Sequence, residues 1–197
     1  MKILFIGDSN TWGWDPRQGA SIRMPKRIRW PQRVCEAMHA ERAEDSLPGR
    51  KIPDGVILEG ICGTIEKNRD ADFLVLLLGT NDMIEMMPGN EDRIVSRWGA
   101  ALNKMRTVLG EKHAERILLC VPPPIRTGQP VNMDGIRNGY KRVAEAHHTR
   151  FLDLSGLPLE LMYDGIHLSE KDQETVAKAV VQALRQPCSF RFDSREL

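Results

Sequence analysis

Short apolar runs alternate with amphipathic segments along this chain, and this alternation limits its fold more than any other feature. The clearest run is Phe73–Leu78, which contains no polar residue. A strand without polar alternation is buried on both faces, as in the centre of a parallel sheet. Because strands that alternate with helices build βα units, the sequence predicts an α/β protein with a mostly parallel sheet.

The individual elements follow from the spacing of apolar residues and from capping residues. Asp134 is expected to cap one helix, and Ser169 with Asp172 forms a capping box before another. The segment Glu44–Gly55 contains two prolines and is expected to be a loop. The predicted strands are Lys2–Ile6, Val56–Leu58, Phe73–Leu78, Arg116–Val121 and Arg150–Leu154. The predicted helices are Trp30–Ala40, Glu91–Leu109, Asp134–His148 and Ser169–Arg185.

Length and charge exclude several classes of protein. The 197 residues predict one domain, residues 1–197, with Pro187–Leu197 as a C-terminal tail. The 28 Lys and Arg residues balance 27 Asp and Glu residues, so no basic field indicates a nucleic-acid partner. No apolar run approaches the ~20 residues of a membrane span or the length of a signal-peptide core. Because neither a span nor a signal peptide is indicated, we expect a cytoplasmic protein, and a small molecule is its expected partner. The four cysteines lack zinc-site spacing and are expected to be free thiols.

Small and polar residues follow most of the predicted strands. In open α/β sheets, ligands bind at the carboxyl ends of the strands, so these segments are the candidates for a site. A sheet edge that serves packing alone needs no such set. In chain order the segments are Gly7-Asp8-Ser9-Asn10, Gly60, Gly79-Thr80-Asn81-Asp82, Pro122–Pro124 and Asp164-Gly165-Ile166-His167.

Three of these segments together supply the parts of a nucleophilic serine site. Ser9 needs a base and a group that orients the base. Asp164 and His167 are three residues apart, so one turn of loop can bring the carboxylate and the imidazole together. The developing oxyanion needs hydrogen-bond donors, and the backbone N–H groups of Ser9 and Gly60 with the side-chain amide of Asn81 are the candidates.

Each segment also has a purely structural interpretation. Gly-Asp-Ser after a strand is often a turn, an isolated Gly60 is commonly a turn residue, and Asp164 with His167 could be a cap and a surface histidine. Asp8 and Asp82 could suggest a metal site, but neither has a second ligand at suitable spacing, and caps explain both. The ordered set of segments, rather than any one of them, favours catalysis without metal or cofactor.

The same segments resemble the four motif blocks of the SGNH hydrolase superfamily, the GDSL-like esterases and lipases, and the resemblance covers the chain from Met1 to about Leu184. It implies that Ser9 is the nucleophile, His167 the base and Asp164 its orienting partner. It also implies that Gly60 and Asn81 complete the oxyanion hole. Asn10 stands where the family name has Leu.

Finer features resemble the arylesterase and acyltransferase branch of that superfamily. They are Thr11-Trp12-Gly13-Trp14 after the serine, Arg29-Trp30, the run Val121–Pro124 and Leu168 after the histidine. The stretch between Gly60 and Phe73 is short for that branch, so substrate preference and self-association as a homo-oligomer stay open. The basic segment Arg17–Arg33 is expected to be a solvated face, with a cationic rim for acidic substrates as the alternative.

The resulting expectation is a flavodoxin-like three-layer α/β/α sandwich with a five-stranded parallel sheet. We expect a serine esterase that cleaves short acyl esters, including aryl esters or acetylated sugars, through an acyl-enzyme. Trp12, Asp8, Asn10 and Ile166, which neighbour the catalytic residues in sequence, are the expected substrate contacts. The alternatives are acyl transfer to alcohols at the same site, a non-catalytic module that binds carbohydrate or another ligand, and a phosphate-binding protein. No glycine-rich phosphate motif supports the last of these.

Overall fold

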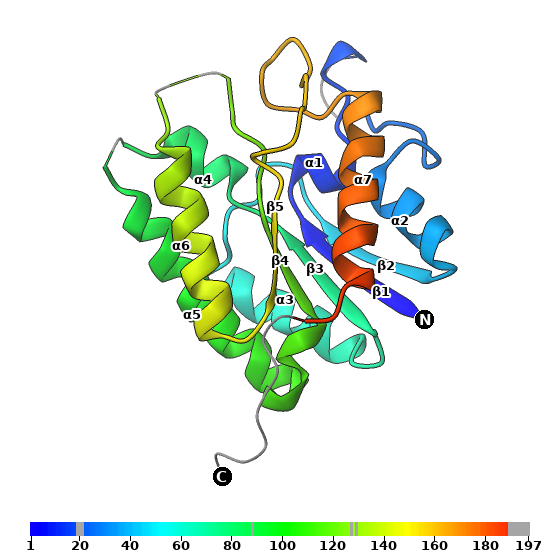
Figure 1. The fold of residues 1–197 in the computed structure, drawn as a ribbon, viewed down its shortest axis with the longest axis vertical. Coiled ribbons are helices and arrows are strands. Elements are labelled where there is room, and N and C mark those ends of the chain that lie inside the picture. The colour runs from blue at the N-terminus through cyan, green and yellow to red at the C-terminus, as the bar shows by residue number, and fades with distance from the viewer. Residues whose placement is uncertain (19–21, 88, 127, 129, 189–197) are drawn as a thin grey trace.

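Five parallel strands form one sheet in the order β2-β1-β3-β4-β5 (Figure 1). A computed structural model describes residues 1–18, 22–87, 89–126, 128 and 130–188. The expected five-stranded parallel sheet is therefore confirmed. The strands are β1 (Lys2–Gly7), β2 (Glu41–Ser46), β3 (Phe73–Leu77), β4 (Ile117–Val121) and β5 (Arg150–Asp153). The α-helices are α1 (Ser9–Trp12), α2 (Trp30–Met38), α3 (Gly55–Lys67), α4 (Thr80–Glu85), α5 (Glu91–Leu109), α6 (Met133–Ala146) and α7 (Glu170–Arg185). The 3₁₀ helices are η1 (Pro16–Gln18) and η2 (Glu111–Arg116).

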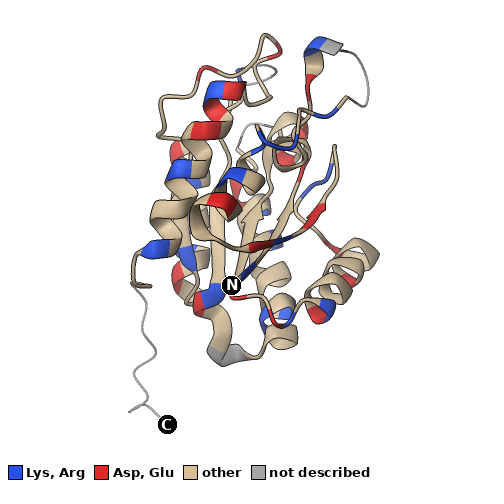
Figure 2. Ribbon diagram, turned by 90° about the vertical axis from the view of Figure 1, so that its right-hand side faces the viewer, with Lys and Arg blue, Asp and Glu red and all other residues tan. Residues whose placement is uncertain are grey.

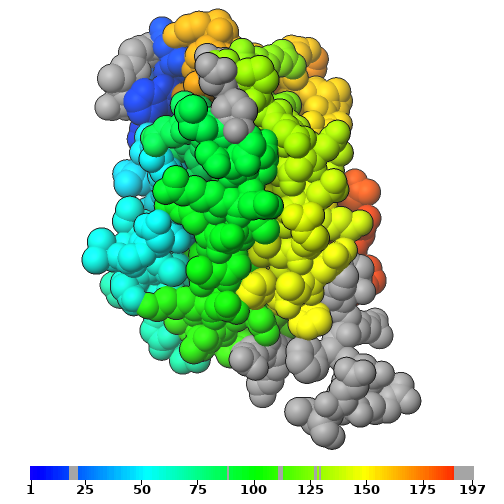
Figure 3. All heavy atoms as spheres, turned by 90° about the vertical axis from the view of Figure 1, so that its left-hand side faces the viewer, coloured from blue at the N-terminus to red at the C-terminus, as the bar shows by residue number. Residues whose placement is uncertain are grey.

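Helices cover both faces of the sheet and bury two separate apolar clusters. Helices α2 and α7 lie on one face, and α3, α5 and α6 lie on the other, where α5 and α6 run side by side in Figure 3. Along β1, Leu4 and Ile6 enter the cluster under α3 and α5, whereas Ile3 and Phe5 enter the cluster under α2 and α7. Fully burying one such side chain contributes ~1.5–3 kcal/mol, which explains why β3 and β4, inside the sheet, carry apolar residues at every position.

The prediction for the second strand is wrong. Val56–Leu58 lies in helix α3, because the chain places apolar residues at Leu58, Ile61 and Ile65, the spacing of one buried helix face. The strand that pairs with β1 on its outer side is β2, which runs parallel to it with Ser46 opposite Gly7. Its sequence Glu-Arg-Ala-Glu-Asp-Ser is almost entirely polar, so no apolar run indicates a strand at this position.

The helix caps near the sheet edge follow the sequence in one case and not in the other. Helix α7 begins after the predicted capping box, in which the Ser169 hydroxyl and the Asp172 carboxylate are both engaged. The cap of helix α6 lies two residues earlier than expected, because Asn132 rather than Asp134 accepts the capping hydrogen bond from the N–H of Gly135. The α7 cap fixes the chain two residues after His167.

Several further expectations concern the surface. Basic and acidic residues are interspersed along the ribbon in Figure 2. Within the described residues, no helix is long and apolar enough to cross a membrane. All four cysteines are free thiols. Of the expected tail Pro187–Leu197, residues 189–197 lie outside the described part of the chain, as do residues 19–21 of the basic segment.

Candidate active site

Ser9 lies at the carboxyl end of β1, where the strand turns directly into helix α1. Asp8 caps this short helix by accepting the N–H of Asn10, at 2.9 Å. Gly7 is required at the turn, because a Cβ there would lie 2.0 Å from the hydroxyl oxygen of Thr11. Since Ser9 is the first residue of α1, its own N–H has no acceptor inside the helix. Ser9 is 6% exposed, so the residue is buried just beneath the surface.

His167 and Asp164 meet Ser9 from the loop between β5 and α7. The Nε2 atom of His167 lies 3.0 Å from Ser9 Oγ, and its Nδ1 atom lies 2.6 Å from Asp164 Oδ2. The other carboxylate oxygen of Asp164 accepts the backbone N–H groups of Ile166 and His167, at 3.0 and 3.1 Å. The structure thus brings together the three residues that the sequence nominated as nucleophile, base and orienting group.

The carboxyl group of Asp164 is held in its charged form. Burial alone would raise its pKa, but the hydrogen bonds from the side chain and backbone of His167 and from the Ile166 backbone lower the pKa below its ordinary value of 3.8. A charged Asp164 orients the imidazole through Nδ1 and leaves Nε2 facing the hydroxyl of Ser9.

Asn10 does not face a substrate, contrary to expectation. The residue is 2% exposed, and its side-chain amide donates to the carbonyl of Ile166 at 3.2 Å and accepts the N–H of Leu168 at 3.0 Å. Its carbonyl accepts the indole N–H of Trp30. Asn10 is therefore engaged on all sides by protein groups.

Asp8 was likewise expected to contact the substrate, and this prediction is wrong because the residue is completely buried. Burial raises the pKa of its carboxyl group from 3.8 to about 6, and the nearby Asp82 carboxylate adds to this shift. The N–H of Asn10 opposes the shift in part. Asp8 shapes the turn that carries Ser9 and does not reach the surface.

Aromatic rings form a wall beside His167. The ring of Trp14 stacks on the imidazole with centroids 6.0 Å apart, and Trp12 lies next to Trp14 rather than on the histidine. The guanidinium of Arg23 covers the indole of Trp12 at 5.0 Å and donates to its carbonyl. Trp12 is half-buried, as is Ile166, so both remain candidates for substrate contact.

Asn81 lies in the first turn of α4, which follows β3, the strand that pairs with β1 on the side away from β2. Its side-chain Nδ2 donates one hydrogen bond to the carbonyl of Arg50, at 2.9 Å. An amide nitrogen carries two hydrogens, so this bond fixes the side chain and leaves a second N–H. The neighbouring Asp82 accepts the N–H of Ile52 and a side-chain N–H of Arg97, which makes it a structural tie between this loop and α5.

Gly60 is not at the sheet edge, and its assignment to the oxyanion hole is wrong. It lies exposed within helix α3, where the apolar spacing of residues 58–65 places it on the solvent side. The residue that occupies the position after the second strand is Gly49. The N–H of Arg50 donates to the carbonyl of Leu47 across a turn with Pro48 and Gly49 at its centre, and Gly49 has a φ of +79°. Pro followed by Gly with positive φ is the signature of a type II turn, so the Pro-Gly pair was the available signal.

This turn, Leu47–Arg50, connects the tip of β1 to Asn81. The N–H of Leu47 donates to the carbonyl of Gly7 at the tip of β1, and the carbonyl of Arg50 accepts from Asn81. The hydrogen bond of the turn uses the N–H of Arg50, which leaves the N–H of Gly49 free of it. Within the described residues, no three His, Cys, Asp or Glu side chains gather as a metal ion would require.

Comparisons with known proteins identify the family and the fold of this chain. A family model for the GDSL-like lipase/acylhydrolase family matches residues 5–174. A sequence search against proteins of curated function found no match. Among solved structures, Est24, a carbohydrate acetylesterase from Sinorhizobium meliloti, is 20% identical with a TM-score of 0.73 over 92% of this chain and 96% of its own. The inhibitor-bound aryl esterase of M. smegmatis is 20% identical with a TM-score of 0.74 over 93% of this chain and 98% of its own.

These structures share the fold of this chain, and the family match spans the strand ends that carry Ser9, Asn81 and His167. An ester hydrolase is the class of enzyme that the family defines. The chain belongs to the GDSL-like lipase/acylhydrolase family.

Proposed function

We propose that this protein hydrolyses short-chain carboxylic esters, with Ser9 as nucleophile, His167 as general base and Asp164 as the group that orients it. One observation carries the proposal. The contacts from Asp164 Oδ2 to His167 Nδ1 and from His167 Nε2 to Ser9 Oγ are 2.6 and 3.0 Å, so the base is within hydrogen-bonding distance of both the nucleophile and its orienting group.

The reaction follows from these contacts. Ser9 Oγ attacks the ester carbonyl carbon while its proton passes to His167 Nε2, and the carbonyl oxygen becomes an oxyanion. When the oxyanion collapses, the C–O bond to the alcohol breaks and His167 returns the proton to the departing alkoxide. Water then attacks the acyl-enzyme with the same base, which releases the acid and restores Ser9.

Three donors around Ser9 suit the oxyanion. The N–H of Ser9 and the second N–H of the Asn81 side chain are two of them. We assign the third to the backbone N–H of Gly49 in place of Gly60, because the turn that contains it is bonded both to the tip of β1 and to Asn81. Donors fixed by the fold stabilise the transition state without having to reorganise.

The substrate is a short acyl ester of a sugar or an aryl alcohol. The similar structures described above are named for acetyl and aryl esters. The half-buried rings of Trp12 and Trp14, tilted by 46° to each other, give this chain an aromatic wall beside His167 against which a sugar or aryl group can pack. Extra methylenes in the acyl chain gain ~0.8 kcal/mol each only where a groove buries them.

The test measures ester hydrolysis by Ser9→Ala. The variant should fold and lose about 10⁶-fold in kcat, because the members of a triad act as a unit. Ser96→Ala is the control, since Ser96 is exposed on α5 and its loss should change nothing. A serine-reactive phosphonate should label the wild-type protein at Ser9. Full activity in Ser9→Ala, or labelling at another serine, would refute the assignment.

The same assay defines the substrate class. Aryl esters from acetate to decanoate, run beside acetylated sugars, should give a maximum kcat/KM at acetyl to butyryl and a decline beyond hexanoyl. A kcat/KM that continues to rise to decanoate would show a long acyl groove instead.

A further inference from the structure

The side chain of Asn10 holds the main chain on both sides of His167. Its Nδ2 donates to the carbonyl of Ile166 and its Oδ1 accepts the N–H of Leu168, at 3.2 and 3.0 Å. The carbonyl can only accept and the N–H can only donate, so a single orientation of the amide satisfies both groups. Both of these backbone groups are adjacent in sequence to the histidine.

Asn10 also follows Ser9 directly within helix α1. The cap from Asp8 to the N–H of Asn10 fixes the start of this helix, and the carbonyl of Asn10 accepts from Trp30. One buried side chain therefore links the helix that carries the hydroxyl to the segment that carries the imidazole. The bond to Leu168 is buried and the bond to Ile166 is partly buried, which limits the competition from water for both.

We propose that Asn10 is a positioning residue that sets the distance between Ser9 Oγ and His167 Nε2. This inference rests on the proposed esterase function, and it replaces the substrate-binding role that the sequence indicated. Asn10 touches no reacting atom; it acts through the backbone of residues 166 and 168. Small errors in this geometry are costly, since a displacement of ~1 Å in a reacting group can lower the rate ~10²-fold.

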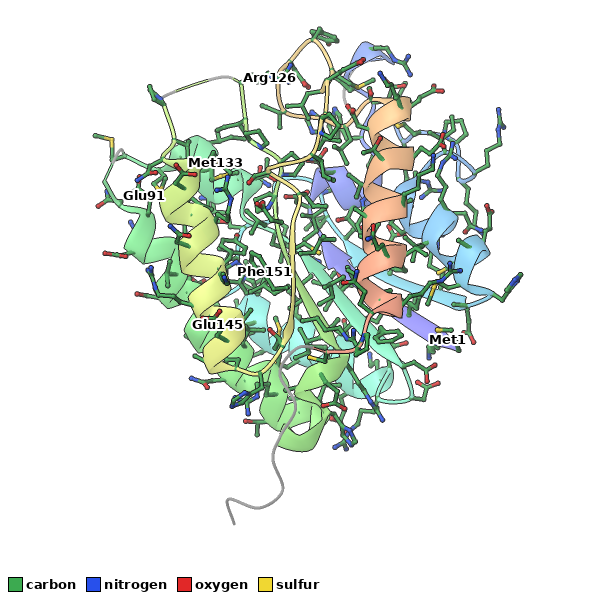
Figure 4. The ribbon with its side chains drawn as sticks, viewed as in Figure 1. Met1, Glu91, Arg126, Met133, Glu145 and Phe151 are labelled. Carbon is green, nitrogen blue, oxygen red and sulfur yellow. The ribbon has the colours of Figure 1, made fainter. Side chains whose placement is uncertain are left out.

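Other contacts hold the same loop at positions other than His167 and its two neighbours. The Asp172 carboxylate accepts the N–H groups of Glu160, Leu161 and Ser169. Arg126, labelled in Figure 4, donates from its side chain to the carbonyls of residues 159 and 160 and from its backbone to the carbonyl of Gly165. Loss of Asn10 should therefore move the histidine locally without detaching the loop.

The test compares three variants. Asn10→Leu has a similar volume but leaves the Ile166 carbonyl and the Leu168 N–H without partners, so kcat for an aryl acetate should fall about 10²-fold while KM is unchanged. Asn10→Asp keeps the acceptor for Leu168 and should lie between Asn10→Leu and wild type. Tyr163→Phe is the matched control, because it removes a hydrogen bond from the same loop to the Pro16 carbonyl without touching the flanks of His167.

A second readout does not depend on activity. The proton between His167 Nδ1 and Asp164 gives a downfield NMR resonance, which should shift or broaden in Asn10→Leu and stay in place in Tyr163→Phe. An unchanged resonance with unchanged kcat would overturn the proposal, and so would a raised KM at constant kcat, which would show that Asn10 binds substrate. If Asn10→Leu does not fold, Asn10→Asp decides by the same two measurements.

These results are separable from failure of the esterase proposal. An enzyme without esterase activity, or an active Ser9→Ala variant, would refute the proposed function. The NMR comparison would still show whether Asn10 controls the position of His167.

Discussion

On the His167 side of Ser9 the polar groups are bound to other parts of the protein, whereas on the Asn81 side hydrogen-bond donors remain free. Asp164 accepts three hydrogen bonds, and Asn10 holds both flanks of the histidine. Across the site, the N–H groups of Ser9 and Gly49 have no hydrogen-bond acceptor among the described residues. The two halves of the site therefore differ in how completely the protein satisfies its own polar groups.

This difference matches the two tasks of an esterase. Proton transfer depends on a fixed distance between donor and acceptor, so the base half gains from being fully bonded. Oxyanion donors must keep their bonding capacity for the transition state, because a donor that is already satisfied gains nothing when charge develops. Substitutions in each half test whether one half serves proton transfer and the other stabilises the oxyanion.

Of the substitutions that compare the two halves, the largest effect is expected in the base half, from Asp164→Asn. The amide can still accept the backbone N–H groups of Ile166 and His167, so the loop should keep its shape, but the imidazole loses its charged partner. We expect kcat to fall about 10⁴-fold. Steady-state kinetics and a crystal structure of the variant would check this. A loss below tenfold with an unchanged loop would mean that Asp164 is dispensable and the base half is misassigned.

The oxyanion half should give the next largest effect. Asn81→Ala removes a side-chain donor, and we expect kcat to fall by ~10²–10³ while KM stays the same. Kinetics with an aryl acetate would measure both constants. If KM rises and kcat does not change, Asn81 binds the ground state, and the contrast between the halves fails at this residue.

Asp8 lies beneath both halves and links stability to pH. Because its pKa rises from 3.8 to about 6 on folding, the native protein holds a proton that the unfolded chain has released between these values. The free energy of unfolding should therefore be highest, as far as this group is concerned, below pH 3.8. It should fall by about 3 kcal/mol as pH rises through 6.

Asp8→Asn should remove this pH dependence while keeping the cap on α1. Urea unfolding of both proteins between pH 4 and pH 7 would measure the difference, and wild type should lose stability relative to the variant as pH increases. A difference that does not vary over this range would show that Asp8 is ionised in the native protein throughout.

The smallest effects are expected from alanine substitutions at Gly49 and Gly60, which compare the proposed oxyanion-hole glycine with the one that the sequence indicated. A Cβ at Gly49 or at Gly60 would meet no heavy atom within 4 Å, so alanine tests the backbone alone at both positions. Gly49→Ala must adopt a φ of +79°, which costs about 1–2 kcal/mol, and should lower kcat by displacing the N–H. Gly60→Ala lies within α3 and should stabilise the protein by roughly 0.5–1 kcal/mol with unchanged kcat.

Thermal unfolding and kinetics of this matched pair would check the assignment. The opposite pattern, with activity lost in Gly60→Ala and kept in Gly49→Ala, would return the third donor to the position that the sequence first indicated.

The sequence predicted those parts of the fold whose buried residues form apolar runs or apolar helix faces. Strand β3 and helix α5 begin at the expected residues, because both elements bury side chains at every turn or on both faces. Asp164 and His167 could be paired because only two residues of loop separate them. Ser9 could be identified as their partner because it follows an apolar strand directly, at the edge of the sheet where ligands bind.

The parts that could not be predicted depend on polar burial. Strand β2 buries Glu44 and Arg42 against each other, with the Glu44 carboxylate 3.3 Å from Arg42, and such pairing leaves no apolar pattern. Because Val56–Leu58 was predicted as a strand, Gly60 was wrongly placed at the end of a strand and therefore in the oxyanion hole. The direction in which Asn10 points depends on the short helix α1, whose four residues have too little sequence to define a face.

Strand β2 has one further consequence, for the behaviour of the protein in solution. It is an edge of the sheet, and its outer backbone groups are the kind of template on which a strand of another chain can add. Charged side chains at four of its six positions oppose such an addition, since a second strand would have to desolvate them. The same charges that hid β2 from prediction therefore protect the side of the sheet nearest Ser9 from aggregation.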